Sequence, residues 1–385
     1  MFSKSGKAQM RLEDVTKYLS KLRIPTGLVF TPTNLEQEKE KFFNSDIYEP
    51  QFEYRRTKNS NAQILKELSS LKTISDVDPR ISNFYVELIA SKEESHRLMN
   101  AVGNNELVSE ISYHRYGKTS PLLFRNASRV LRNRVSGYNI VKYPSRQANQ
   151  MLGYEEIERV FNTVFDGFGI QGWKVKPSKG IAKNGAKVGV KSRWVLLDPN
   201  IKRSKFRLKK TLVHEVGTHV LRAVNGEQTG FEALSRANLP SYLDIEEGLA
   251  TWNEENMNLL TKKWLKSKAA MVWAIYIGER MTFRQLYNSL LGVIPKKSAF
   301  NTAYRVKRGL EDTSYPGIYT RDVVYFRGYR RVKKKLEKDK SMYEKLYAGK
   351  IDFKQCRWVD EGLLPKAKIV PTQEKWNEIF KKAGI

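Results

Sequence analysis

Residues 211–220 read Thr-Leu-Val-His-Glu-Val-Gly-Thr-His-Val and hold two of the four histidines in this 385-residue chain. In zinc peptidase helices the pattern is H-E-x-x-H, because side chains four residues apart share one face and reach one ion. His214 and His219 are five residues apart, so on a regular helix their side chains diverge by about 140°. Both can bind one ion only if a π-bulge widens the turn, and Gly217 makes that distortion cheap. We therefore predict a widened turn between His214 and His219.

The residue pattern favours a metal site over a chance pair of histidines. A chance pair on a core helix would leave one imidazole bonded to a carbonyl and the other exposed. Glu215, which directly follows the first histidine, and the rarity of histidine in the chain argue against it. Valines at helical spacing would also bury the opposite side of this helix: Val213, Val216, Val220 and Val224.

A third ligand is needed, because a hydrolytic zinc site has three protein ligands and one open position for water. Cys356 is isolated and therefore a poor candidate. Residues 244–252, Asp-Ile-Glu-Glu-Gly-Leu-Ala-Thr-Trp, begin the next expected helix and offer Glu246 and Glu247. These differ by about 100° around a helix, so only one can face the ion, and the helical wheel leaves the choice open. Alternatively, Asp244 and Glu247 form a capping box that occupies Glu247 with backbone amides.

The charge balance narrows the classes of partner. Lys and Arg number 69 against 41 Asp and Glu, a net charge of +28, which favours acidic protein tails, nucleic acid or anionic lipid. The single cysteine excludes an internal disulfide framework and a thiolate-rich metal site. Residues 1–15 lack the apolar stretch of a secretory signal, and the longest apolar run, 269–277, is about half of a membrane span. We expect a soluble, cytoplasmic protein.

The order of expected elements predicts an α+β fold. Apolar spacing indicates helices over these stretches: 35–43, 62–71, 84–100, 154–165, 204–224, 244–260, 261–291 and 319–347. Strands are expected at 172–177 and 187–198. We predict a mainly helical N-terminal region over 1–150 and a second region over 151–385 with a helical C-terminal part, the two packing as one compact unit.

At its histidine motif the chain resembles a known family. His-Glu-Val-Gly-Thr-His at 214–219, together with Glu-Glu-Gly-Leu-Ala at 246–250, is similar to the paired motifs of microtubule-associated tyrosine carboxypeptidases and their bacterial QEGLA-motif relatives. Weaker similarities are Pro-Gln-Phe-Glu-Tyr at 50–54, Arg222, Asn225 and Val-Val-Tyr-Phe-Arg-Gly at 323–328. The resemblance spans roughly residues 35 to 350. It implies a zincin-like metallopeptidase core over 151–385, with a small twisted sheet beside the active-site helix.

The resemblance also implies the site and the reaction. One zinc ion would be bound by His214, His219 and Glu247, with Glu215 as the catalytic base. The Glu-Gly-Leu-Ala string resembles the third-ligand helix of gluzincin aminopeptidases, where the Glu before Gly binds zinc, and this selects Glu247 over Glu246. Eukaryotic members remove the C-terminal tyrosine of α-tubulin. The chain is therefore expected to be a zinc metallocarboxypeptidase that detyrosinates acidic tails, with tubulin or microtubules as partner and a place on the cytoskeleton.

Candidates for the remaining roles come from the mechanism. The oxyanion needs a donor besides the metal, and Tyr325 or Arg327 in the 323–328 stretch is a candidate. A carboxypeptidase also needs a fixed cation for the substrate carboxylate. Arg222, one turn beyond His219, is the first candidate, with Arg327 and Arg330 as rivals. For each arginine a solvated surface role is the alternative.

Two other functions remain open from the sequence. The first is a zinc endo- or exopeptidase of the same mechanism that acts on a different, non-tubulin peptide. The second is a basic nucleic-acid-binding protein without catalysis, in which phosphate contacts would account for the net charge of +28. The sequence has no RNP-type aromatic motif, zinc-finger spacing or phosphate-binding glycine loop, so nucleic acid ranks last as the specific partner.

Overall fold

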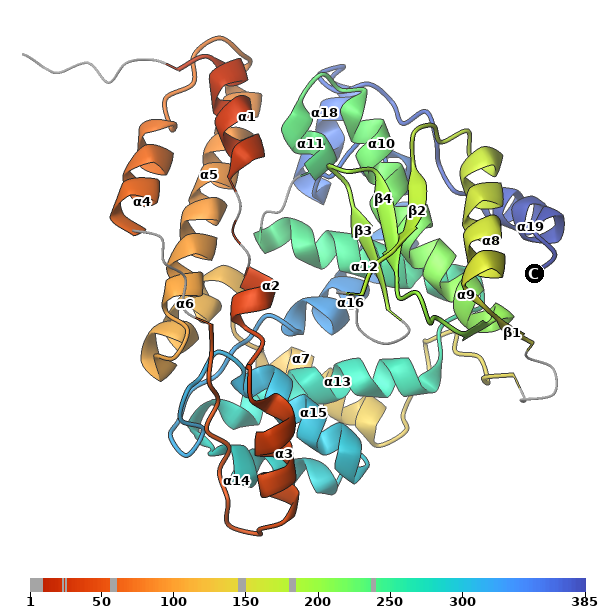
Figure 1. Cartoon of the computed structure of the whole chain (residues 1–385). Helices are drawn as coiled ribbons and strands as arrows, with labels where there is room; N and C mark the ends of the chain where they lie inside the picture. The colour runs from red at the N-terminus through yellow and green to blue at the C-terminus, as the bar shows by residue number, and fades with distance from the viewer. Residues whose placement is uncertain are drawn as a thin grey trace, which may run out of the picture. The chain divides into compact units, whose positions relative to one another are not determined.

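The computed structural model describes residues 10–385 except Arg23, Pro25, 56–60, 145–149, 180–184 and 237–239. Helices dominate and the strands form two small sheets, which confirms the α+β class (Figure 1). The chain divides into two compact units, of which unit 1 comprises Met1–Val135, Asn238–Pro240 and Lys266–Phe326. Unit 2 comprises Ser136–Ala237, Ser241–Leu265 and Arg327–Ile385. Within the described ranges, no helix has both the length and the apolar character that crossing a membrane requires.

Unit 1 is helical. Its elements are α1 (Leu12–Lys21), α2 (Thr26–Val29), α3 (Leu35–Phe43), α4 (Asn61–Ser70), α5 (Pro79–Asn100), α6 (Asn105–Tyr116), α7 (Pro121–Leu131), the 3₁₀ turn η2 (Gly278–Arg280), α14 (Phe283–Leu291) and α15 (Lys296–Lys307). The helices predicted near 35–43, 62–71 and 84–100 are confirmed as α3, α4 and α5. Helix α5 begins before its predicted start, because the Asp78 side chain caps it by accepting from the Arg80 amide. Residues 266–326, which we grouped with the C-terminal region, cluster with unit 1.

Unit 2 contains the strands. A three-stranded sheet has the order β2 (Lys174–Pro177), β4 (Trp194–Leu197), β3 (Ala186–Gly189), with β2 parallel and β3 antiparallel to β4. A second sheet pairs β1 (Met151–Leu152) with β5 (Arg203–Ser204). The single strand predicted over 187–198 is wrong, since the segment folds back as a β3–β4 hairpin. The turn spans residues 190–193 and directly follows Gly189, and Arg193 within it has a φ of 53°.

The helices of unit 2 include the one that carries the histidine motif. They are α8 (Tyr154–Gly167), α9 (Lys205–Thr211), η1 (Leu212–Val220), α10 (Leu221–Glu227), α11 (Glu232–Arg236), α12 (Pro240–Asn256), α17 (Met342–Leu346), the 3₁₀ turn η3 (Phe353–Gln355), α18 (Cys356–Asp360) and α19 (Gln373–Lys382). Helices α13 (Lys262–Ile277) and α16 (Val323–Lys338) contribute residues to both units.

The element that carries both histidines is a π-helix. Helix α9 is capped by the Ser204 side chain, which accepts from the Arg207 amide, and it runs through η1 into α10. Element η1 spans Leu212–Val220 with π geometry, so the predicted widened turn is confirmed. Its apolar side is fully buried and contacts α8 and β3, and its buried residues include Leu212, Val213, Val216 and Val220. The polar residues of the motif therefore lie on the side of the helix opposite its buried apolar residues.

Helices α12 and α16 approach each other closely at a pair of glycines, Gly248 and Gly328. A Cβ atom on Gly248 would lie 2.4 Å from the backbone carbon of Gly328. A Cβ atom on Gly328 would lie 2.0 Å from the carbonyl oxygen of Asp244. Each contact is to backbone, which cannot rotate away, so only glycine allows this crossing. The crossing fixes the position of α12 and explains the glycines of both the 246–250 and 323–328 motifs.

We expect Gly328→Ala to lower the free energy of unfolding by about 1–3 kcal/mol, the usual cost of overpacking. Chemical denaturation of the two proteins measures the difference. The matched control is Gly292→Ala, because the nearest atom to its added Cβ is the Ser289 carbonyl oxygen at 3.9 Å. The control should be neutral or slightly stabilising. An unfolding free energy of Gly328→Ala equal to that of the control would contradict the close crossing.

Candidate metal centre

Three side chains that the sequence singled out come together in unit 2. One ligand atom each of His214, His219 and Glu247 lie within 4.8 Å of one another. The two imidazole rings are 5.1 Å apart with planes at 75°, and His214 Nε2 is 3.6 Å from Glu247 Oε2. Around a tetrahedral zinc ion with bonds of about 2.0–2.2 Å, ligand atoms are about 3.4 Å apart. The donor set therefore fits one zinc ion.

A further carboxylate contacts the Nδ1 atom of each imidazole. Glu254 Oε1 is 2.9 Å from His214 Nδ1, and Glu246 Oε1 is 2.8 Å from His219 Nδ1. A carboxylate on Nδ1 fixes the tautomer and the ring orientation and leaves Nε2 for a metal. Of the two adjacent acids, Glu247 lies with the two imidazoles, and Glu246 contacts His219 from its Nδ1 side.

Helix α12 supplies all three of these acidic side chains. It begins at Pro240, so Asp244 lies inside the helix. The alternative capping box of Asp244 and Glu247 is therefore wrong. Glu247 and Glu254 are seven residues apart, which is about two helical turns, so they lie on one face and both approach His214. The sequence analysis missed Glu254, although this seven-residue spacing from the expected ligand was visible.

The two orienting carboxylates have their own cations. Lys350 Nζ donates to Glu246 Oε1 at 2.5 Å, and Arg222 pairs with the other oxygen of Glu246. Burial opposes ionisation of Glu246, but Lys350 and Arg222 hold the pKa of its carboxyl well below the usual range. Lys210 Nζ lies 2.8 Å from Glu254 Oε2. The charges of Glu246 and Glu254 are thus balanced within the protein.

Glu215 is half-buried on η1, next to His214. No side chain of the described residues donates a hydrogen bond to its carboxylate, which leaves it available as a base. Arg203 of β5 lies on the same side of this helix, since it donates to Thr211 Oγ1, one turn before Glu215. Burial lowers the pKa of the Arg203 guanidinium, and the charge of Glu215 acts in the opposite direction. Sequence reasoning did not single out Arg203.

Arg222 does not have the role that we predicted for it. Its side chain is fully buried, and its guanidinium pairs with Glu246. Nε donates to the carbonyl oxygens of Leu346 and Gly349 at 2.9 and 3.1 Å, and Nη2 donates to that of Ile351 at 2.6 Å. A guanidinium enclosed in this way cannot receive a substrate carboxylate. Arg222 instead holds Glu246, and through it His219.

Arg327 and Arg330, the other two arginine candidates, also have partners within the protein. Arg327 forms a bidentate pair with Asp244, in which Nε and Nη2 lie 2.7 and 2.8 Å from the two carboxylate oxygens. This pair links α16 to α12, so substrate binding by Arg327 does not fit the geometry. Arg330 Nη1 donates to the Tyr138 hydroxyl at 2.8 Å.

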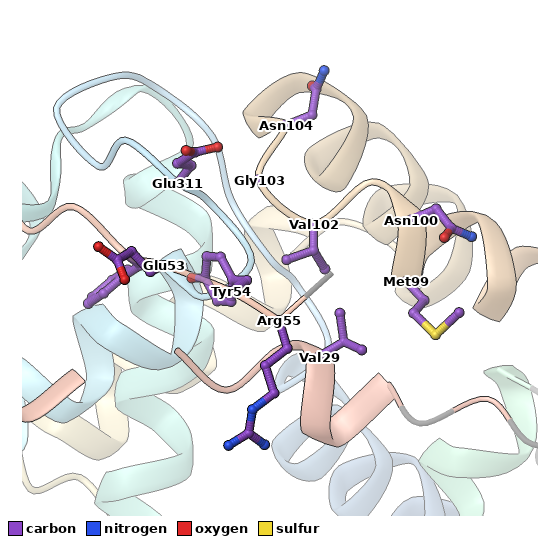
Figure 2. Close-up of a pocket in the computed structure, with 11 residues that line it drawn as sticks. Val29, Glu53, Tyr54, Arg55, Met99, Asn100, Val102, Gly103, Asn104 and Glu311 are labelled. Carbon is purple, nitrogen blue, oxygen red and sulfur yellow. The ribbon is translucent and has the colours of Figure 1, made fainter. Parts of the chain in front are cut away.

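Two predicted features belong to unit 1, whereas the donor set belongs to unit 2. Lys268 Nζ lies 3.7 Å from the ring centroid of Tyr325, whose role as oxyanion donor remains a prediction. Phe52, Glu53 and Tyr54 of the 50–54 motif line a cavity of about 670 Å³ (Figure 2). Tyr54 Oη in this motif accepts from the Gly309 amide at 2.7 Å and donates to the Leu310 carbonyl at 3.1 Å. These bonds give the motif a structural role within unit 1.

We expect Glu254→Gln to weaken zinc binding by about tenfold or more, the usual effect of removing a charged partner of a histidine ligand. Competition with a chromophoric chelator measures the dissociation constant. Glu255→Gln is the matched control, since the adjacent Glu255 pairs with Lys333 and accepts from the Asn139 amide. Its zinc affinity should equal that of the unsubstituted protein. Equal affinities of all three proteins would reject the role of Glu254.

The chain is similar to known proteins over most of its length. A family model described as microtubule-associated tyrosine carboxypeptidase matches residues 40–380. Microtubule-associated tyrosine carboxypeptidase 1 of Mus musculus is 26% identical over 311 residues, 78% of this chain and 55% of the relative. The protein of that name from Homo sapiens is 34% identical over 134 residues, 33% of this chain and 28% of the relative.

These matches cover different amounts of the relatives. The chain spans about half the length of the mouse relative, at 55%. The family model, by contrast, covers most of the chain and includes both the 214–219 and 246–250 motifs. The chain belongs to the microtubule-associated tyrosine carboxypeptidase family.

Proposed function

We propose that this chain is a zinc-dependent metallocarboxypeptidase that removes a C-terminal tyrosine from acidic protein tails such as that of α-tubulin. The observation that carries the proposal is the convergence of His214, His219 and Glu247, with Glu215 next to His214 on the same helix. Family membership supports the peptidase reaction. The names of the relatives support tyrosine as the residue released and microtubules as the partner. A zincin-like core around η1 is part of the same proposal.

The residues divide the reaction between them. A zinc ion bound by His214, His219 and Glu247 would lower the pKa of the attacking water and polarise the scissile carbonyl. Glu215 accepts the proton of that water and passes it to the leaving amine. The charges of Glu247 and Glu215 together would offset that of a divalent ion.

Arg203 is our candidate for the substrate carboxylate. A carboxypeptidase needs a cation near the catalytic base, because the terminal carboxylate is one residue from the scissile bond. Arg222 and Arg327 pair with Glu246 and Asp244. Arg203, which donates to Thr211 Oγ1, is half-buried beside the η1 face that carries Glu215, and the charge of Glu215 acts on its guanidinium. The forked guanidinium suits a carboxylate better than a lysine ammonium does. The net charge of +28 would attract acidic tails as a whole.

A peptide assay tests the reaction. A peptide ending in Glu-Glu-Tyr should release tyrosine, and its C-terminal amide should not, because a carboxypeptidase recognises the free carboxylate. Glu215→Gln should retain stoichiometric zinc and lose about 10²–10⁴-fold in kcat, the usual contribution of a general base. Tyrosine release is measured by chromatography and zinc by elemental analysis. Full turnover by Glu215→Gln would exclude its role, and equal turnover of the amide would exclude carboxypeptidase specificity.

Arg203→Gln tests carboxylate recognition separately from chemistry. We expect KM for the free-acid peptide to rise about tenfold or more, because a charge-assisted hydrogen bond to an ion contributes about 1.5–3 kcal/mol. Arg207→Gln is the matched control, four residues away, where the guanidinium carbon lies 5.4 Å from the ring centroid of Tyr143. Equal KM values for the two variants would remove Arg203 from the site.

The alternative peptidase would share the metal chemistry but not the substrate. Internal cleavage of a mixed peptide library, with the Glu-Glu-Tyr peptide left intact, would favour it over our proposal.

A further inference from the structure

Two buried hydrogen bonds hold Gly217 and Thr218, the residues in the middle of the widened turn. Tyr347 Oη donates to the carbonyl oxygen of Gly217 at 2.7 Å. Asn253 Nδ2 donates to Thr218 Oγ1 at 2.8 Å. Both bonds are buried, where hydrogen bonds are electrostatically stronger than in water. Neither Tyr347 nor Asn253 belongs to the donor set.

These hydrogen bonds form a network in which each donor and acceptor can be assigned. The amide of Asn253 has two hydrogens, of which one goes to Thr218 Oγ1 and the other to Tyr347 Oη, also at 2.8 Å. The single hydroxyl hydrogen of Tyr347 is then committed to the Gly217 carbonyl. Asn253 Oδ1 accepts from Tyr343 Oη at 3.0 Å. Every side-chain hydrogen that Asn253 and Tyr347 can donate thus has an acceptor, which fixes the orientation of both side chains.

The same turn is also fixed by packing. A Cβ atom on Gly217 would lie 2.8 Å from Cζ2 of Trp376, a buried residue of α19. Trp376 therefore occupies the space that a side chain at position 217 would need. The widened turn is enclosed by an aromatic ring and tied by hydrogen bonds through Tyr347 and Asn253.

A π-helix has poorer geometry than an α-helix and persists only where surroundings stabilise it. If the turn tightened to α geometry, His214 and His219 would diverge by about 140° and could not share an ion. We propose that Tyr347 and Asn253 are positioning residues of the metal centre, which hold residues 217 and 218 in the widened turn so that both imidazoles converge. The inference rests on the proposed zinc site and extends it to residues that touch neither metal nor substrate.

Two nearly isosteric substitutions each remove one bond to the turn: Tyr347→Phe and Thr218→Val. Zinc dissociation constants are measured by chelator competition, and the visible absorption of the Co²⁺-substituted protein reports the ligand geometry. We expect each variant to bind zinc about tenfold more weakly, as when other supporting partners of metal ligands are removed. The Co²⁺ absorption bands should shift in both. If one of the two variants fails to fold, the other still tests the same turn.

Tyr343→Phe is the control within the same cluster. It removes the hydroxyl that contacts Asn253 Oδ1, Tyr347 Oη and the Pro371 carbonyl oxygen. The two groups that donate to residues 217 and 218 stay in place. Its zinc affinity and Co²⁺ spectrum should match those of the unsubstituted protein. Equal weakening by Tyr343→Phe would overturn the inference, because the loss would then follow general packing.

The outcomes separate this inference from the proposed function. If the unsubstituted protein does not bind one zinc ion, the zinc site itself is rejected and the inference with it. If it binds zinc, and Tyr347→Phe and Thr218→Val bind it with the same affinity and the same Co²⁺ spectrum, the inference alone is overturned.

Discussion

Two imidazoles five residues apart can meet at one ion only on a helix turn that is wider than an α-helical turn. This constraint organises the surroundings of the histidine motif. The apolar side of η1 is buried against α8 and β3, while its polar side carries His214, Glu215 and His219. A π-helix is less stable than an α-helix by itself, so contacts with the surrounding elements must stabilise it. In unit 2, helix α12, Tyr347 and Trp376 supply contacts of this kind.

Helix α12 provides the largest part of this support. It offers two pairs of residues seven apart, Glu246 with Asn253 and Glu247 with Glu254, so that two adjacent rows of one helix face η1. One row contacts His219 and the middle of the turn, and the other contacts His214. The close crossing at Gly248 fixes this helix in place. Lys350 and Arg222 balance the charge of Glu246, and Lys210 balances that of Glu254.

The sequence predicted those features that depend on local spacing. The widened turn followed from the positions of His214 and His219 alone, and α3 followed from apolar periodicity. Features that depend on burial or distant partners were not visible. Arg222 was a plausible substrate ligand by position, but its actual partners include Glu246 and carbonyl oxygens more than a hundred residues later in the chain. With 69 basic residues, composition cannot show which arginine faces a cleft and which is enclosed.

The choice between Glu246 and Glu247 shows the same limit. A helical wheel separates the two side chains by about 100° but does not say which direction faces the histidines. The resemblance selected Glu247 as the ligand, yet it gave no role to Glu246, which orients His219. Roles of supporting residues arise from the packing of α12 on η1, and that packing is set by the glycine crossing with α16.

X-ray diffraction from crystals grown with zinc, recorded on both sides of the zinc absorption edge, tests the central claim most directly. The account predicts one anomalous peak about 2.0–2.2 Å from the Nε2 atoms of His214 and His219 and from a carboxylate oxygen of Glu247. A peak at another set of side chains, or none at these three in zinc-saturated crystals, would contradict it.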